Sequence, residues 1–270
     1  MAKEIERLLK GDGMMKYVVM EEKGDITHIS LDRAAKYNAL NKEMLEELVE
    51  TVKHTKNSKA KVVVLSGKGS AFCSGGDIRM MEDFSDKVYF DGVMGTIKEL
   101  VMELYTMPKI VISAIHGAAA GLGLSIALTA DYVIAERDAK LGMLFLGIGL
   151  LPDGGGHFFL QQRIGIQRAK QFTWGMQQID GQRAKEIGLV DMLSDEEAIV
   201  TAKGLAEKLL KSPLIAMLKT KELYHSREKE SLASFLSDEQ QAQWELRQTQ
   251  DHQEGVRAFL EKRKPVFKGK

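Results

Sequence analysis

Cysteine is almost absent from this chain of 270 residues, which contains only Cys73. A single cysteine excludes an internal disulfide framework and a multi-cysteine zinc site, and it fits a reducing compartment. No two of the six histidines are spaced to share one helical turn, so a histidine-based zinc site would need distant partners. We therefore expect a cytoplasmic protein without a metal centre.

Net charge is also absent. Lys plus Arg number 38 and Asp plus Glu number 38, which gives a formal net charge of 0. A chain without a basic excess has no overall field that attracts a phosphate backbone, so nucleic acid is not an expected partner. The hydrophobic content of 44% and the charged content of 28% are typical of a globular protein and exclude disordered and collagen-like classes.

Long apolar runs are scarce. Residues 1–13 mix charges throughout, so we expect no secretory signal. Residues 110–130 contain no Asp, Glu, Lys or Arg and are long enough to span a bilayer. Three glycines and His116 interrupt this run, and a buried strand, a glycine turn and a buried helix explain it better. We therefore expect no membrane contact.

The hydrophobic pattern alternates strands and helices up to about residue 195 and is mostly helical afterwards. We expect an α/β core over residues 14–195, a helical region over 196–270, and an N-terminal extension over 1–13 without an assigned role. Predicted strands cover residues 17–22, 25–31, 61–66, 109–115, 131–135 and 189–193, with another near Leu141. Predicted helices include one capped by Asn41 and those at 87–105, 154–164, 167–176 and 180–187.

Common nucleotide-binding and nucleophile motifs are missing. Neither G-x-G-x-x-G nor G-x-x-x-x-G-K-[ST] occurs. The segment GLSIA, residues 123–127, lacks the final glycine of the G-x-S-x-G elbow and follows a glycine turn, so we expect Ser125 to be a helix residue. Cys73, beside Phe72, is expected to be a small apolar filler.

Two glycine-rich loops each follow an apolar strand: SGKGSAFCSGGDI, residues 66–78, and IHGAAAGLGLSIALTADY, residues 115–132. Glycine permits a ligand to approach the backbone, and a loop that enters a helix presents unpaired N–H groups. Two such loops side by side would form a two-donor pocket for a developing oxyanion. The alternative is that these glycines only make tight turns, and the residues alone leave it open.

Both loops, followed by LGIGLLPDGGG, resemble the crotonase (enoyl-CoA hydratase/isomerase) superfamily. LDRAAKYNAL, residues 31–40, resembles an early family element, with Ala34 where proline is usual, and residues 254–270 are similar to the C-terminal signature. The resemblance implies a crotonase-like spiral of ββα units with a helical C-terminal trimerisation region. It also implies an acyl-CoA substrate, no cofactor beyond the coenzyme A of that substrate, and assembly as a trimer or a dimer of trimers.

The resemblance assigns the oxyanion hole to the backbone N–H groups of Gly76 and Leu122. Leu122 stands where the family usually has glycine, which a backbone donor tolerates unless the side chain crowds the acyl group. Such a pocket would stabilise the enolate formed when a proton leaves the carbon next to the thioester.

The acid and base positions point to isomerisation rather than hydration. Hydratases of the family use two glutamates, and the matching positions here are Ser125 and Phe145, neither of which can act as a base near neutral pH. Asp153 stands where most members have glycine, but an acid occurs there in the 1,2-epoxyphenylacetyl-CoA isomerase and some 3,2-enoyl-CoA isomerases. One acid suffices to move a proton between two carbons, so we expect Asp153 to be catalytic. The alternative is that it caps the next helix.

Other expected substrate contacts follow from the same resemblance. Ser74 and Ile78 match positions that contact the adenine through the main chain, and Arg33 matches a position that meets CoA phosphate. Phe145 would keep the acyl pocket dry, and His157 would orient Asp153 or touch substrate. A surface role for Arg33 and a packing role for His157 remain alternatives. Four side chains are expected to set the pocket width: Met80, Met81, Phe84 and Leu144.

Several functions remain open besides enoyl-CoA isomerisation. The first is an enoyl-CoA hydratase, and the second is a hydrolase or dehalogenase that uses Asp153 as a nucleophile. A non-catalytic binding protein of the same fold is the third, and a serine hydrolase built on Ser125 is the least favoured. The sequence does not identify the acyl group.

Overall fold

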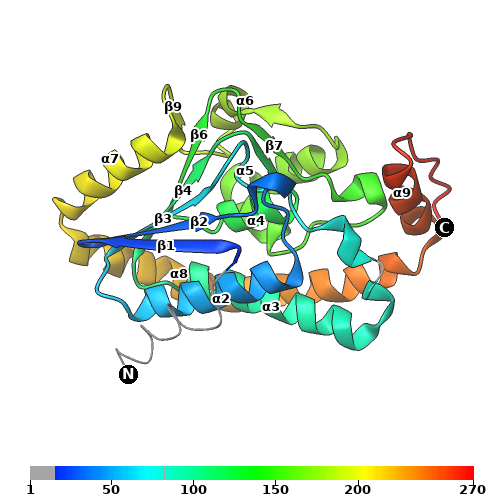
Figure 1. The fold of residues 1–270 in the computed structure, drawn as a ribbon, viewed down its shortest axis with the longest axis horizontal. Helices are drawn as coiled ribbons and strands as arrows, with labels where there is room; N and C mark the ends of the chain where they lie inside the picture. The colour runs from blue at the N-terminus through cyan, green and yellow to red at the C-terminus, as the bar shows by residue number, and fades with distance from the viewer. Residues whose placement is uncertain (1–15, 82) are drawn as a thin grey trace.

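The computed structural model describes residues 16–81 and 83–270. A six-stranded sheet with the order β1-β2-β3-β4-β6-β9 forms its centre (Figure 1). Its strands are β1 (Val18–Lys23), β2 (Ile26–Leu31), β3 (Val62–Gly67), β4 (Ile110–Ile115), β6 (Tyr132–Glu136) and β9 (Met192–Ser194). Only β1 and β2 pair antiparallel within this sheet. A smaller sheet contains β5 (Ala118–Ala120), β7 (Lys140–Gly142) and β8 (Ile179–Asp180).

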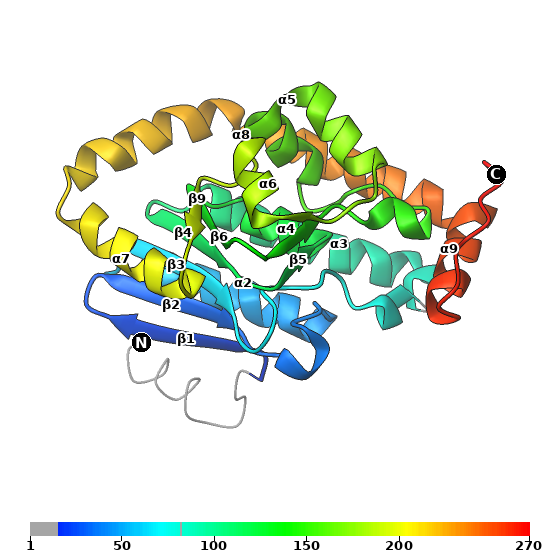
Figure 2. The same ribbon diagram turned by 90° about the horizontal axis from the view of Figure 1, so that it is seen from above.

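Helices connect these strands and cover the sheet. The described α-helices are α2 (Lys42–Asn57), α3 (Lys87–Tyr105), α4 (Leu122–Ala127), α5 (Gly156–Trp174), α6 (Gly181–Glu186), α7 (Ala198–Leu210), α8 (Leu214–Arg247) and α9 (Gln250–Leu260). The described short 3₁₀ helices are η1 (Ala34–Lys36), η2 (Ile78–Met81), η3 (Asp83–Ser85) and η4 (Phe145–Ile148). The long helix α8 runs past α3 toward the C-terminal end, where α9 lies (Figure 2).

Strand β3 shows why the central strands are continuous apolar runs. Val62 and Val64 pack into a cluster with α7, whereas Val63 and Leu65 pack into the main core together with α2 and α3. Successive strand residues point to opposite faces, so a strand covered on both faces needs apolar side chains at every position. The α/β class with a helical C-terminal region is therefore confirmed.

Most of the predicted elements are confirmed. β1 and β2 form the expected hairpin, α3 has the predicted bounds, and Asn41 caps α2 by accepting a hydrogen bond from Met44 N at 3.2 Å. The uncharged run at 110–130 forms β4, β5 and α4. No helix in the described part of the chain is both long and apolar enough to cross a membrane.

The two helices predicted over 154–164 and 167–176 are confirmed as the two parts of α5 (Gly156–Trp174), which is interrupted by a non-helical backbone at Gly165. Gly165 has φ of 75°, a value that glycine adopts without a steric penalty, so the chain turns there without a separate loop. The boundary at residue 195 stays a prediction, and the extension over residues 1–13 lies outside the described residues.

Candidate active site

Two glycine loops are joined edge to edge. Cys73 N donates to Ala118 O at 2.9 Å and Ala120 N donates to Cys73 O at 3.0 Å, so the first loop pairs with β5. This pairing brings Gly75 against the second loop, where an added Cβ would lie 2.8 Å from Ala120 O. Gly75 has φ of 102°, and only glycine adopts such a conformation readily. Close backbone contact therefore explains the glycine at this position.

Gly76 and Leu122 follow these turns and line one cavity of about 410 Å³. On either side of Gly76, Leu40 N donates to Gly75 O and Asp77 N donates to Leu40 O, both at 2.8 Å. No backbone hydrogen bond between described residues uses the N–H of Gly76. Leu122 is the first residue of α4, and the first N–H groups of a helix have no partner within it. Two N–H groups on the wall of one cavity form the arrangement expected of an oxyanion hole.

The side chain of Leu122 packs against Gly154. Its Cδ1 would lie 2.5 Å from a Cβ added at Gly154, which has φ of 63°. Gly154 follows Asp153, so this contact joins the donor residue Leu122 to the segment that carries the carboxyl. Glycine is needed at position 154 because both the backbone conformation and the leucine exclude a larger residue.

Apolar side chains form most of the cavity wall. Four polar or charged side chains also line it, those of Ser74, Asp153, Gln243 and Arg247. The apolar lining comes from Ile78, Met80, Phe84, Val93, Met94, Ile97, Leu122, Leu144, Phe145, Ile148, Leu150, Met176 and Phe259. Three of the four residues expected to set the pocket width are in this set, and the side chain of Met81 lies outside the described part of the chain.

Asp153 is the carboxyl group of this cavity. The residue is 7% exposed, and its Oδ1 has no hydrogen-bond partner among the described residues. Burial raises the pKa of this carboxyl to about 7, the negative charge of Glu239 adds to that shift, and Arg247 opposes it. A carboxyl with such a pKa holds and releases a proton near neutral pH.

The backbone of Asp153, in contrast to its carboxyl group, is firmly bonded. Ser125 Oγ donates to Asp153 O at 2.7 Å, and Gly156 N donates to the same oxygen at 3.1 Å. The residue that precedes α5 is Gly155, without a side-chain cap. The interpretation of Asp153 as a helix cap is therefore wrong, and its side chain stays available to the cavity.

Three other residues in or near the loops have structural contacts. Ser125 lies in α4 as predicted, and the Phe145 ring would lie 3.5 Å from a Cβ added at Gly121. Burial raises the pKa of the Cys73 thiol to about 12, and its Sγ would lie 2.6 Å from a Cβ at Gly123. Cys73 is thus the buried filler that was predicted, and a thiol with this pKa is a poor nucleophile.

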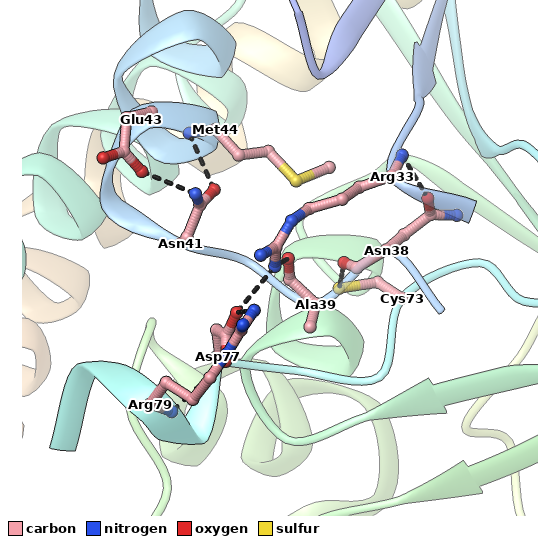
Figure 3. A network of polar contacts seen from close by, with 9 residues as sticks. All are labelled: Arg33, Asn38, Ala39, Asn41, Glu43, Met44, Cys73, Asp77 and Arg79. Atoms are coloured by element: carbon pink, nitrogen blue, oxygen red, sulfur yellow. Dashed lines mark hydrogen bonds and ion pairs between the residues drawn. The ribbon is translucent and has the colours of Figure 1, made fainter. Parts of the chain in front are cut away.

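Arg33 lies in a polar network outside the cavity lining (Figure 3). Its Nη1 donates to Ala39 O and to Asp77 Oδ2, both at 2.8 Å. Arg79 also bonds Asp77, and the two guanidinium groups hold the pKa of this carboxyl well below its usual range. The side chain of Arg33 is only 12% exposed, so its interpretation as a solvated surface residue is wrong. Its contact with CoA phosphate stays a prediction.

His157 lies apart from the cavity that contains Asp153. It lines a separate cavity of about 180 Å³, and its Nδ1 lies 2.8 Å from Glu239 Oε1. The expected contact with substrate is therefore not supported by its position, because Glu239 holds the ring. Ser74, Ile78 and Phe145, in contrast, line the Asp153 cavity as expected.

Sequence reasoning missed two residues of helix α8, Glu239 and Gln243. Glu239 is 3% exposed and Gln243 is fully buried, which is unusual for these residue types. Their spacing of four residues places them on one helix face, and this is the only signal that the sequence holds. Within the described residues, no group of three or more His, Cys, Asp or Glu is placed to hold a metal ion.

Comparisons with known proteins agree with this geometry. Residues 21–270 match the family described as enoyl-CoA hydratase/isomerase. The chain is 47% identical over 253 residues to Bacillus subtilis YhaR, named as an enoyl-CoA hydratase/isomerase, which covers 94% of this chain and 99% of the relative. It is 33% identical over 262 residues to the 1,2-epoxyphenylacetyl-CoA isomerase of Escherichia coli, covering 95% and 100% of the two chains.

A solved structure shares the fold. An enoyl-CoA hydratase from Mycobacterium avium subsp. paratuberculosis superposes with a TM-score of 0.84 at 28% identity, covering 94% of this chain and 99% of that one. The spiral fold that the sequence motifs implied is therefore confirmed.

Proposed function

The chain belongs to the enoyl-CoA hydratase/isomerase family, and we propose that within it the protein is an isomerase that moves a proton with Asp153. Members of this family act on acyl-CoA thioesters. The observation that carries the proposal is the carboxyl of Asp153: it is buried, its Oδ1 has no described partner, and it lines the same cavity as Gly76 and Leu122.

In the proposed reaction the thioester oxygen accepts hydrogen bonds from Gly76 N–H and Leu122 N–H. Asp153 removes a proton from the carbon next to the thioester of a 3-enoyl-CoA, and the electron pair moves toward the thioester oxygen to give an enolate. The same carboxyl then returns the proton to C4, which leaves a conjugated 2-enoyl-CoA. Each donor to the enolate oxygen contributes ~10²–10³ in rate in comparable sites.

The lining of the cavity supports a proton shuttle. A pKa of about 7 lets Asp153 both take and return a proton near neutral pH. Phe145 and Leu144 line this cavity with apolar side chains, and Phe145 stands where the resemblance places one of the two water-activating glutamates of a hydratase. An apolar side chain there does not hold water for an addition reaction. The coenzyme A of the substrate is the only additional group that this reaction requires.

A hydratase is the second candidate function, favoured by the name of the solved relative with a TM-score of 0.84. Hydration by two carboxylates needs a second acid on the cavity, and Asp153 is the one carboxylate among its described lining residues. Glu239 does not line the cavity, and its carboxylate makes three hydrogen bonds, to Gly155 N, His157 N and the His157 ring. These contacts favour isomerisation.

The test follows absorbance of the conjugated 2-enoyl thioester when purified protein is mixed with a 3-enoyl-CoA. We expect conversion by the wild type and a fall in kcat of ~10²–10⁴ in Asp153→Asn, the range for loss of a general acid–base group. Equal rates in the two proteins would contradict the role of Asp153. A 3-hydroxyacyl-CoA product from a 2-enoyl substrate would instead indicate a hydratase, and heavy oxygen from water in Asp153 after one turnover would indicate a nucleophile.

Self-association as a trimer or a dimer of trimers completes the proposal. Helix α8 exposes three large apolar side chains near its start, Ile215, Leu223 and Tyr224, which are 81%, 63% and 70% exposed. Large apolar side chains exposed on a helix are candidates for burial in an interface. Sedimentation equilibrium gives the test: three or six times the chain mass of 30.1 kDa is expected, and a monomer would contradict it.

A further inference from the structure

A buried glutamate holds the chain immediately after Asp153. Glu239, on α8, accepts hydrogen bonds from Gly155 N at 2.7 Å, from His157 N at 3.1 Å and from the His157 ring at Nδ1, 2.8 Å away. These groups begin α5, which has no side-chain cap of its own. One carboxylate from a distant helix therefore satisfies the N-terminal end of α5, where a negative charge is favourable.

The same face of α8 holds the chain just before Asp153. Gln243, four residues after Glu239, is fully buried, and its Nε2 donates to Leu151 O at 2.5 Å. Residues four apart lie on one side of a helix. Asp153 therefore sits in a short segment with both of its flanks bonded to one stripe of α8.

Charges around the Asp153 carboxyl come from the same helix. Glu239 favours the protonated form of this carboxyl, and Arg247, eight residues further along α8, favours the ionised form. The Arg247 guanidinium lies 4.4 Å from the centre of the Phe84 ring, which places it at the cavity wall. His157 is a further titratable side chain next to Glu239, and its ring contacts Glu239 rather than Asp153.

We propose that Glu239 is a positioning residue for Asp153: it anchors the segment that carries this side chain and places a fixed negative charge close to the carboxyl. Glu239 does not line the cavity, so it acts through Asp153 and not on the substrate. The inference rests on the proposed function of Asp153 as the proton carrier, and it adds a group that, together with burial, influences how readily this carboxyl holds its proton.

The experiment measures the ionisation of Asp153 in Glu239→Gln. The readouts are the pH–rate profile for 3-enoyl-CoA and the carbonyl stretch of the protonated carboxyl, identified by infrared difference spectroscopy as the band absent from Asp153→Asn. Gln keeps the size and one acceptor oxygen but removes the charge. We expect the midpoint of the pH–rate profile and the midpoint of the infrared titration each to fall by about one pH unit or more, the usual effect of removing a close like charge.

The matched control is Asp238→Asn, which removes an exposed negative charge from the adjacent position of α8. Solvent screens that charge, so the midpoint should match the wild type. An unchanged midpoint in Glu239→Gln, or an equal fall in Asp238→Asn, would overturn the proposal.

A second variant covers the case in which Glu239→Gln does not fold. Glu239→Asp keeps the charge but is one methylene shorter, so we expect the wild-type midpoint with a several-fold lower kcat. A wild-type kcat, or a midpoint in the ordinary aspartate range, would overturn the proposal. The infrared midpoint does not depend on turnover, so a shift in it would support the role of Glu239 even if Asp153→Asn kept full activity and the isomerase proposal failed.

Discussion

Two aspartates near the two glycine loops are the same residue type in opposite surroundings. Asp77 follows Gly76 and is bonded by Arg79 and Arg33, which hold its pKa well below the usual range. Asp153 is buried with Oδ1 unpartnered among the described residues, and its pKa is raised to about 7. Both are 7% exposed, and burial disfavours the ionised form of each carboxyl. At Asp77 the hydrogen bonds from Arg79 and Arg33 outweigh burial and keep the carboxyl ionised. At Asp153 burial is the main cause of the raised pKa, and the negative charge of Glu239 adds to it.

Removing the carboxylate of Asp77 should give the largest stability change in this comparison. Asp77→Asn leaves Arg33, whose side chain is only 12% exposed, without its carboxylate partner, and breaking a buried pair costs about 3 kcal/mol. Urea unfolding at pH 7 checks this. The matched control is Asp32→Asn, because the pair between Asp32 and Lys68 is exposed and such pairs contribute below ~1 kcal/mol. Equal losses in both variants would contradict the comparison.

Removing the carboxyl of Asp153 should have the opposite effect on stability, and the effect should depend on pH. The folded pKa of about 7 exceeds the ordinary aspartate value of 3.8, so stability is lost as pH rises between these values. The Asp153→Asn variant does not lose this stability, because asparagine does not ionise. We expect its advantage in free energy of unfolding over the wild type to grow by about 3 kcal/mol between pH 5 and pH 8.

Thermal melting in the two buffers measures this difference. Asp77→Asn supplies the contrast, because a lowered pKa stabilises the fold above the unfolded value and loses that contribution only in acid. Its deficit should therefore be the same at pH 5 and pH 8. A constant offset for Asp153→Asn as well would show that its carboxyl is not raised.

Backbone geometry at the second loop should matter less than either carboxyl. Gly121 has φ of 53°, and an added Cβ would contact the Phe145 ring at 3.5 Å. Gly121→Ala should cost ~1–2 kcal/mol in strain and reduce kcat about tenfold, because a shift of Leu122 N–H weakens the oxyanion hole. Gly204→Ala on α7, with open space around it, is the control and should keep full activity. Steady-state kinetics on both variants decides.

The hydroxyl of Ser125 should have the smallest effect. Ser125→Ala removes the hydrogen bond to Asp153 O, which contributes about 1 kcal/mol, and Gly156 N still donates to that oxygen. We expect a loss of a few-fold in kcat with an unchanged pH midpoint, measured by the same absorbance assay. A complete loss of activity would instead assign Ser125 a direct chemical role.

Local patterns predicted most of the fold and part of the site. Two β-rich runs that meet at Lys23–Gly24 predicted the β1–β2 hairpin, and the spacing of Met44, Leu45 and Leu48 predicted α2, because these signals lie within a few residues of one another. The break at Gly165 lies between the two helices predicted there, because a glycine within a helical pattern is a local signal for an interruption. The positions of His157 and Arg33 were undecided, because their partners Glu239 and Asp77 are 82 and 44 residues away.

The sequence by itself determined the chemistry available: two glycine loops that expose backbone N–H groups, no glutamate at residues 125 and 145, and a single acid at Asp153. Only the tertiary structure decided how that acid behaves. Its carboxyl is near Glu239 and Arg247 because α8 packs against α5. Electrostatic coupling depends on distance through space and on the water that packing removes, and neither quantity is present in the order of residues along the chain.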